Sequence, residues 1–219
     1  MAKKRSIDRL LEIMARLRAP DGCPWDREQD HQTLRFHAVE EVYELLDAIE
    51  ARDDDEMTEE LGDLLLQVVF HCQLGRERKA FDFEKVAGRI ADKLIHRHPH
   101  VFGSAKVNSV EAVWTQWEKI KRAEKAGTRS ERASALDGIP KHLPALLRAE
   151  KLVKKGRKAG LIKTAGGTRR LTRKKVAETL YRIAAVAQAR GWSAEELLRS
   201  ETKRVEKALR RLEKRKSKS

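Results

Sequence analysis

The sequence has 219 residues, with 48 Lys and Arg against 34 Asp and Glu, which gives a formal net charge of +14. Its two cysteines are too few for a disulfide framework, and no apolar run is long enough for a secretory leader or a membrane span. Aromatic residues make up only 5% of the chain, and alternating runs of Val, Ile and Thr are missing. These features exclude a disulfide-rich secreted scaffold and a membrane protein, and they predict an all-α, cytoplasmic protein.

Two successive helices are predicted by apolar residues that recur at three- and four-residue steps. These residues are Val39, Val42, Tyr43, Leu46 and Ile49 in the first stretch, and Leu61, Leu64, Leu65, Val68 and Cys72 in the second. The polar segment 52–55, Arg-Asp-Asp-Asp, lies between the two stretches and predicts a turn. The sequence therefore favours an antiparallel helical hairpin.

Carboxylates accompany both apolar stripes. Glu41 and Glu44 are three residues apart on the first helix, and Glu60 and Asp63 have the same spacing on the second, so each pair projects from one side of its helix. Antiparallel packing would bring all four together, and their mutual repulsion would require a compensating cation. Because all the ligands are oxygens, this cation is expected to be Mg²⁺ or Mn²⁺ and not Zn²⁺.

The alternative is that these acids form a solvated helix face. A solvated helix in so basic a protein normally mixes charges at i, i+4, yet residues 39–51 contain no Lys or Arg. The metal site is therefore the favoured interpretation. Gly62 is a further anomaly, because glycine inside a helix costs about 1 kcal/mol relative to alanine. We expect another backbone to approach closely there.

Two further pairs are spaced four residues apart. Lys93 and Arg97 accompany the next predicted helix, over residues 86–96, and Trp117 and Lys121 follow later in the chain. From spacing alone, Lys93 and Arg97 would be ordinary surface charges, and core packing is the main alternative for Trp117.

The two halves of the chain differ in charge. Residues 1–120 contain 18 Lys and Arg against 24 Asp and Glu, a net charge of −6, whereas residues 121–219 contain 30 against 10, a net charge of +20. Polar segments at 125–130 and 164–170 resemble linkers. We expect a catalytic domain over 1–125, a linker and connecting helix over 126–170, and a basic helical region over 171–219. Helices are predicted there over 172–189 and 193–212.

Several segments together resemble the MazG family of nucleoside triphosphate pyrophosphohydrolases, which are all-α. They are Asp-Gly-Cys-Pro-Trp-Asp at 21–26, Glu-Glu-x-x-Glu at 40–44, Glu-x-x-Asp at 60–63, Leu-Gly-Asp-Leu-Leu at 61–65, Arg-His-Pro-His-Val-Phe at 97–102, and Ser-Ala-Leu-Asp-Gly-Ile-Pro at 134–140 with Leu-Pro-Ala-Leu at 143–146. The resemblance covers residues 6–160 and implies a dimeric helical bundle that hydrolyses NTP or dNTP to the monophosphate and pyrophosphate.

The resemblance also implies a role for each singled-out residue. Mg²⁺ would be held by Glu41, Glu44, Glu60 and Asp63, with Glu40 as a further ligand or as the group that orients water. Lys93 and Arg97 would bind the triphosphate, where Arg offers a bidentate fork and Lys a point charge. Trp117 would contact the base, with Lys121 nearby, and stacking on a flat ring suits a broad substrate range.

The basic region 171–219 departs from a two-domain family pattern, since it resembles a second MazG repeat that lacks the Glu-Glu-x-x-Glu helix. Two alternatives to the enzyme remain open at this point: a nucleotide-sensing protein without catalytic activity, and a nucleic-acid-binding protein with a vestigial MazG domain. The apolar spacing of residues such as Val176, Leu180, Val205 and Leu209 favours a region that covers the first domain over a nucleic-acid-binding arm.

Overall fold

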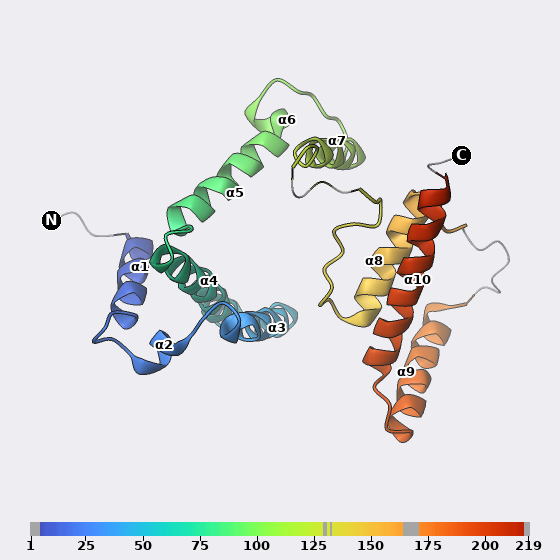
Figure 1. Cartoon of the computed structure of the whole chain (residues 1–219), viewed down its shortest axis with the longest axis horizontal. Helices are drawn as coiled ribbons and strands as arrows, with labels where there is room; N and C mark the ends of the chain where they lie inside the picture. Colours follow the sequence, from blue (N-terminus) through green and yellow to red (C-terminus); the bar gives the residue numbers. More distant parts are fainter. Residues whose placement is uncertain (1–4, 129–130, 132, 164–170, 217–219) are drawn as a thin grey trace. The chain divides into compact units, whose positions relative to one another are not determined.

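The computed structural model describes residues 5–128, 131, 133–163 and 171–216. Parts of the predicted linkers, at 129–130, 132 and 164–170, and the basic end 217–219 therefore lie outside the described residues. Within the described ranges every regular element is a helix, which confirms the all-α prediction (Figure 1). None of these helices combines the length and the apolar character that crossing a membrane requires.

The chain divides into two compact units, Met1–Trp117 and Glu118–Ser219. The boundary falls inside one helix, α7. The elements of the first unit are α1 (Ser6–Leu17), α2 (Pro24–Glu28), the 3₁₀ helix η1 (Thr33–Arg35), α3 (His37–Ala51), α4 (Asp54–Glu77), α5 (Phe83–Arg97), α6 (Pro99–Phe102) and the start of α7 (Val110–Ala123). The second unit contains α8 (Ala145–Lys158), α9 (Arg173–Ala189) and α10 (Ala194–Lys216).

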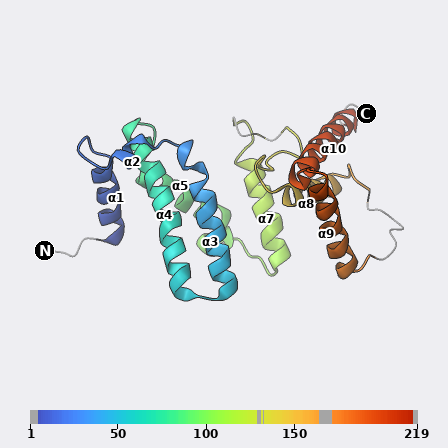
Figure 2. The same ribbon diagram turned by 90° about the horizontal axis from the view of Figure 1, so that it is seen from below.

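The predicted helical hairpin is formed by α3 and α4, which pack against each other over a short turn (Figures 1 and 2). Arg52 ends α3 in the left-handed conformation, with φ at 58°. The side chain of Asp53 then caps α4 by accepting hydrogen bonds from the backbone N–H groups of Asp55 and Glu56. Because capping is a local interaction, the turn could be predicted from the sequence, although Asp54 and Asp55 already belong to α4.

The core of the first unit lies at one end of this hairpin. Its buried members come from α1, η1 and the second half of α4, namely Met14, Leu34, Val69, Phe70 and Leu74. All buried residues of α4 lie at Gln67 or later, and Ala48 is the one buried residue of α3. The half of the hairpin next to its turn therefore has almost no core of its own.

The Asp-Gly-Cys-Pro-Trp-Asp segment at 21–26 follows the end of α1. The backbone N–H of Cys23 donates to the carbonyl of Leu17 at 2.8 Å, which ends α1. A side chain at Gly22 would meet the same carbonyl oxygen at 2.2 Å, so glycine is required there. Nearby, the guanidinium of Arg18 donates two hydrogen bonds of 2.7 Å to the carboxylate of Glu77 and lies over the ring of Phe70. Arg18 therefore joins the end of α1 to α4, and its guanidinium also donates to the backbone carbonyl of Asp26 in this motif.

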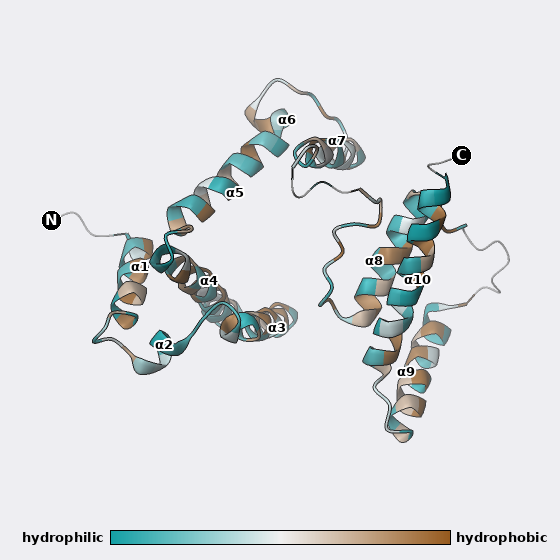
Figure 3. Cartoon of the chain, in the orientation of Figure 1, coloured by the Kyte–Doolittle hydropathy of each residue, from teal (hydrophilic) through white to brown (hydrophobic). Residues whose placement is uncertain are grey.

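The second unit has a separate core, in which α8 packs against α10. Leu136, Leu152 and Leu209 are its buried members. Ser193 caps the start of α10, because the backbone N–H of Glu196 donates to its hydroxyl at 3.2 Å. By contrast α9 contributes one buried residue, Ala187, and leaves apolar side chains exposed along its length, where brown and teal segments alternate in Figure 3.

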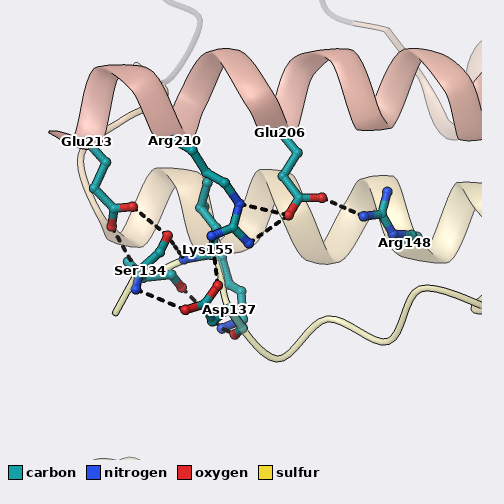
Figure 4. Close-up of polar contacts among 9 residues, drawn as sticks. Ser134, Asp137, Arg148, Lys155, Glu206, Arg210 and Glu213 are labelled. Atoms are coloured by element: carbon teal, nitrogen blue, oxygen red, sulfur yellow. Dashed lines mark hydrogen bonds and ion pairs between the residues drawn. The ribbon is translucent and has the colours of Figure 1, made fainter. Parts of the chain in front are cut away.

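A network of charged groups joins α8, α10 and the segment before α8 (Figure 4). Glu206 on α10 pairs with Arg148 on α8, whose side chain is only 7% exposed, at 2.5 Å. Arg210 donates to Glu206 and also to Asp137, at 2.7–3.0 Å. Burial acts to raise the pKa of Glu206, but hydrogen bonds from Arg210 and Arg148 outweigh it and leave this pKa lowered. The same balance, with Arg210 and the backbone of Ser134 as donors, lowers the pKa of Asp137.

Candidate active site

Helix geometry brings three of the four predicted carboxylates of α3 and α4 together. Ligand oxygens of Glu41, Glu60 and Asp63 all lie within 4.8 Å of one another, and each of these side chains is partly buried. Glu44 is more exposed but is close enough for its charge to raise the pKa of both Glu41 and Glu60. Glu40 lies outside this group, since it is exposed and its carboxylate is 3.8 Å from the ring of His37.

The electrostatics of this acidic cluster are unfavourable without a cation. Burial is the largest cause that raises the pKa of Glu41, followed by the charges of Asp63 and Glu44. Burial also comes first for Glu60, whose pKa is raised further by Glu44, Asp63 and Glu41. The oxygen Oε2 of Glu60 is shielded from solvent, yet it accepts no hydrogen bond from the described residues. A shielded carboxylate oxygen without a donor, next to two further carboxylates, fits a hard divalent cation.

One polar neighbour of the cluster was not anticipated from the sequence. Gln67 is buried on α4, one turn after Asp63, and its amide Nε2 donates a long hydrogen bond of 3.4 Å to Oε1 of Glu41. Its position could have been noticed, because it interrupts the otherwise apolar run Leu-Leu-Leu-Gln-Val-Val-Phe at 64–70. The contact orients Glu41 from the opposite helix.

The close backbone approach predicted at Gly62 is not made within the described part of a single chain. A Cβ built at this position would meet no atom within 4 Å. The glycine thus lies in open space on the exposed side of α4, near the exposed side chains of Leu61 and Leu65. No contact in the described part of a single chain offsets the loss of helix stability that glycine causes at this position.

The second group of predicted residues, those for phosphate and base, lies on two other helices, α5 and α7. Lys93 is exposed on α5, which leads away from the α3–α4 hairpin in Figure 1. Arg97 ends α5, and its guanidinium carbon lies 5.8 Å from the ring centre of Trp117. Trp117 also packs edge-on against Trp114, with ring centres 5.5 Å apart. The structure thus brings together Arg97 and Trp117, whereas Lys121, one turn further along α7, lies 3.5 Å from Glu118.

Comparison with known proteins gives the cluster a context. Residues 29–102 match the MazG nucleotide pyrophosphohydrolase domain. The matched range includes the acidic cluster, Lys93 and Arg97, and it ends before Trp117.

Alignments with individual proteins extend over more of the chain than the domain match does. The chain is 50% identical over 150 residues to the nucleoside triphosphate pyrophosphohydrolase of Escherichia coli K12, and this alignment covers 68% of the chain and 56% of that protein. It is 45% identical over 154 residues to the nucleoside triphosphate pyrophosphohydrolase/pyrophosphatase MazG of Thermotoga maritima, covering 70% and 58%. The crystal structure of a mazG-related protein from Thermotoga maritima aligns with a TM-score of 0.45 and 28% identity, over 52% of this chain and 97% of that one. The chain thus spans little more than half the length of these two curated relatives.

Proposed function

Since the chain belongs to the MazG family through residues 29–102, we propose that it hydrolyses nucleoside triphosphates, NTP or dNTP, to the monophosphate and pyrophosphate. The reaction depends on Mg²⁺ or Mn²⁺ in this proposal, and its physiological role is to clear nucleotides from the pool. The observation that carries the proposal is the acidic cluster, in which Glu41, Glu60 and Asp63 offer oxygens within 4.8 Å of one another.

The metal would be held by Glu41, Glu44, Glu60 and Asp63. When bound, Mg²⁺ supplies positive charge that polarises the phosphates and makes a bound water more nucleophilic. Gln67 fixes the orientation of Glu41 through its amide. Glu40, one residue earlier and exposed to solvent, serves as a further ligand or orients the attacking water.

Substrate recognition would use the second group of residues. Lys93 and Arg97 bind the triphosphate and stabilise the pyrophosphate leaving group. Trp117 offers a flat ring to the base, and Lys121 lies near it on the same helix. Stacking does not distinguish the edges of the bases, so we expect several nucleotides to be accepted.

Product analysis tests this function directly. The purified chain should release pyrophosphate from several NTPs or dNTPs when Mg²⁺ or Mn²⁺ is present, and release should stop when EDTA is added. Orthophosphate should then appear only after inorganic pyrophosphatase is added to the reaction. If orthophosphate is instead the first product, the wrong phosphoanhydride bond has been assigned.

We further propose that the enzyme is a homodimer. The two copies would meet through α3 and the first half of α4, the part of the hairpin that has almost no core of its own. Large apolar side chains are exposed on both helices there, at Val39, Val42, Tyr43, Leu46, Ile49, Leu61 and Leu65. So many neighbouring apolar side chains are rarely left in contact with water, which supports a partner surface of the same kind.

Gly62 offers a matched test of this dimer. If the backbone of a second copy packs at Gly62, then Gly62→Ala should weaken association and raise the dimer dissociation constant measured by light scattering on dilution. The control is Gly88→Ala on α5, where an added Cβ also meets no atom within 4 Å. The control should leave association unchanged and stabilise its helix by about 1 kcal/mol. Identical behaviour of the two variants, or a monomer at all concentrations, would reject this interface.

A further inference from the structure

Acidic and basic side chains are separated on α10. The helix contains five acidic residues and nine Lys or Arg residues. Three of the acids are used in contacts with other segments of the second unit: Glu195 accepts from the backbone N–H of Ala145, Glu206 pairs with Arg148, and Glu213 accepts from Ser134 and from the backbone N–H of Ala135. These contacts turn negative charge toward α8 and the segment before it, as Figure 4 shows for Glu206 and Glu213.

From Lys203 onward the side of α10 that faces solvent is basic, whereas Glu196 and Glu201 are exposed nearer its start. Lys203, Lys207, Arg211 and Arg215 are all exposed, and they recur at four-residue intervals. No hydrogen bond or ion pair joins any of these four side chains to the rest of the described chain. We call this set the α10 basic stripe. Arg204, by contrast, is paired with Glu201 at 2.6 Å, and Arg210 is turned inward to Glu206 and Asp137.

This arrangement differs from an ordinary solvated helix. Solvated helices usually place opposite charges at i, i+4, whereas each i, i+4 step along the α10 basic stripe joins two cations, which destabilises an isolated helix. The helix dipole favours cations only in the last turn and so does not account for Lys203 or Lys207. A polyanionic ligand would remove this repulsion.

Against the covering role that apolar spacing favoured for residues 171–219, we propose that the α10 basic stripe binds the phosphate backbone of double-stranded nucleic acid. Successive members of the stripe are separated by about 6 Å along the helix axis, and a duplex presents one phosphate charge per about 1.7 Å of its axis, so several members can reach phosphates together. α10 contains no aromatic residue. Single strands are usually held by stacking of bases on aromatic rings, so contacts by this helix suit a duplex and carry no sequence preference.

The test uses the full chain and fluorescence anisotropy with a short labelled duplex of mixed sequence, at several NaCl concentrations. The variant is Lys203→Gln, Lys207→Gln and Arg211→Gln together. A control with the same charge change is Arg173→Gln, Lys174→Gln and Arg182→Gln on α9, where these side chains are also exposed. Each phosphate contact contributes a slope of about 0.9 in log K against log salt. The α10 variant should therefore lower that slope by about 2 to 3 and weaken binding at least about tenfold at low salt, with little effect of the α9 control.

Three outcomes would overturn the proposal: no binding by the wild-type chain even at low salt, equal losses in the α9 and α10 variants, or equally tight binding of polyglutamate, which would indicate an acidic protein partner. Duplex DNA and duplex RNA are compared in separate arms, and a single strand should bind more weakly than either. Circular dichroism checks that the α10 variant stays helical. Its pyrophosphate release should equal that of the wild type, so failure of this proposal is distinguishable from failure of the proposed enzymatic function.

Discussion

Replacing Glu41 by Gln, or Asp63 by Asn, is expected to lower pyrophosphate release by about 100-fold or more, because each change removes one of the charges proposed to hold the metal, with little change in size. The same variants should be at least as stable as the wild type when no metal is present. This follows from the raised pKa values of Glu41 and Glu60, because burial and then the neighbouring carboxylates disfavour the charged forms of both groups in the folded state.

Thermal unfolding with and without Mg²⁺ separates this explanation from simple misfolding. Mg²⁺ at about 100 times its dissociation constant should stabilise the wild type by about 2.7 kcal/mol. The variants should lose most of that gain. Glu50→Gln, on the same helix but outside the acidic cluster, is the control and should behave like the wild type. A Glu41 or Asp63 variant that keeps near-normal turnover would show that these carboxylates do not hold the metal.

The stability of the metal-free protein as a function of pH is a second way to compare the wild type with the Glu41 variant. A carboxylate whose folded pKa is raised contributes stability that is present below the unfolded pKa, about 4.3 for Glu, and is lost as the pH rises through the folded pKa. The acidic cluster should therefore make the metal-free first unit less stable as the pH rises above about 4.3. The loss of stability with rising pH should be smaller in the Glu41→Gln variant.

The second large effect concerns the charge network of the second unit. Glu206→Leu should destabilise this unit by about 3 to 5 kcal/mol, because it leaves the buried guanidinium of Arg148 without its carboxylate. The double replacement Arg148→Met with Glu206→Leu should recover most of the loss, since apolar side chains of similar size replace a buried pair at little cost. Urea unfolding of the two single variants and the double variant gives the coupling energy.

Glu201→Gln is the matched control for this cycle. Glu201 pairs with Arg204 on the exposed side of α10, with both side chains at least half exposed, so the loss should not exceed about 1 kcal/mol. The lowered pKa values of Glu206 and Asp137 predict stability that is present at neutral pH and is lost as the pH falls below about 4. If Glu206→Leu and Glu201→Gln cost the same, the buried network does not stabilise the unit.

The helices, the hairpin turn and the convergence of the carboxylates could be predicted because they depend on local periodicity and on the antiparallel return of the chain. Asp53 and Ser193 could be predicted to cap α4 and α10 for the same reason, because each cap joins residues that are close in the sequence. Gly62 shows the limit of such reasoning. A glycine on a helix suggests a close neighbour, but the sequence does not say whether that neighbour lies in the same chain.

Ion pairs between residues far apart in the chain could not be predicted from the sequence. Arg148 and Glu206 are 58 residues apart, and nothing in their local patterns distinguishes them from the exposed charges around them. Likewise, the count of basic residues in the second half did not reveal which ones face solvent. The separation on α10 becomes visible only when the inward contacts of Glu195, Glu206 and Glu213 are known. Net charge thus predicted a basic surface but not its location.

The position of the core at one end of the hairpin has a thermodynamic consequence for the other end. Segments with few buried side chains open locally at low free-energy cost, so α3 and the first half of α4 should be the part of the hairpin that fluctuates most readily. A cation held by both helices, as proposed above, would act there as a cross-link between them. Metal binding and closure of the hairpin would then be one coupled equilibrium, in which each change that favours closure raises metal affinity by the same free energy.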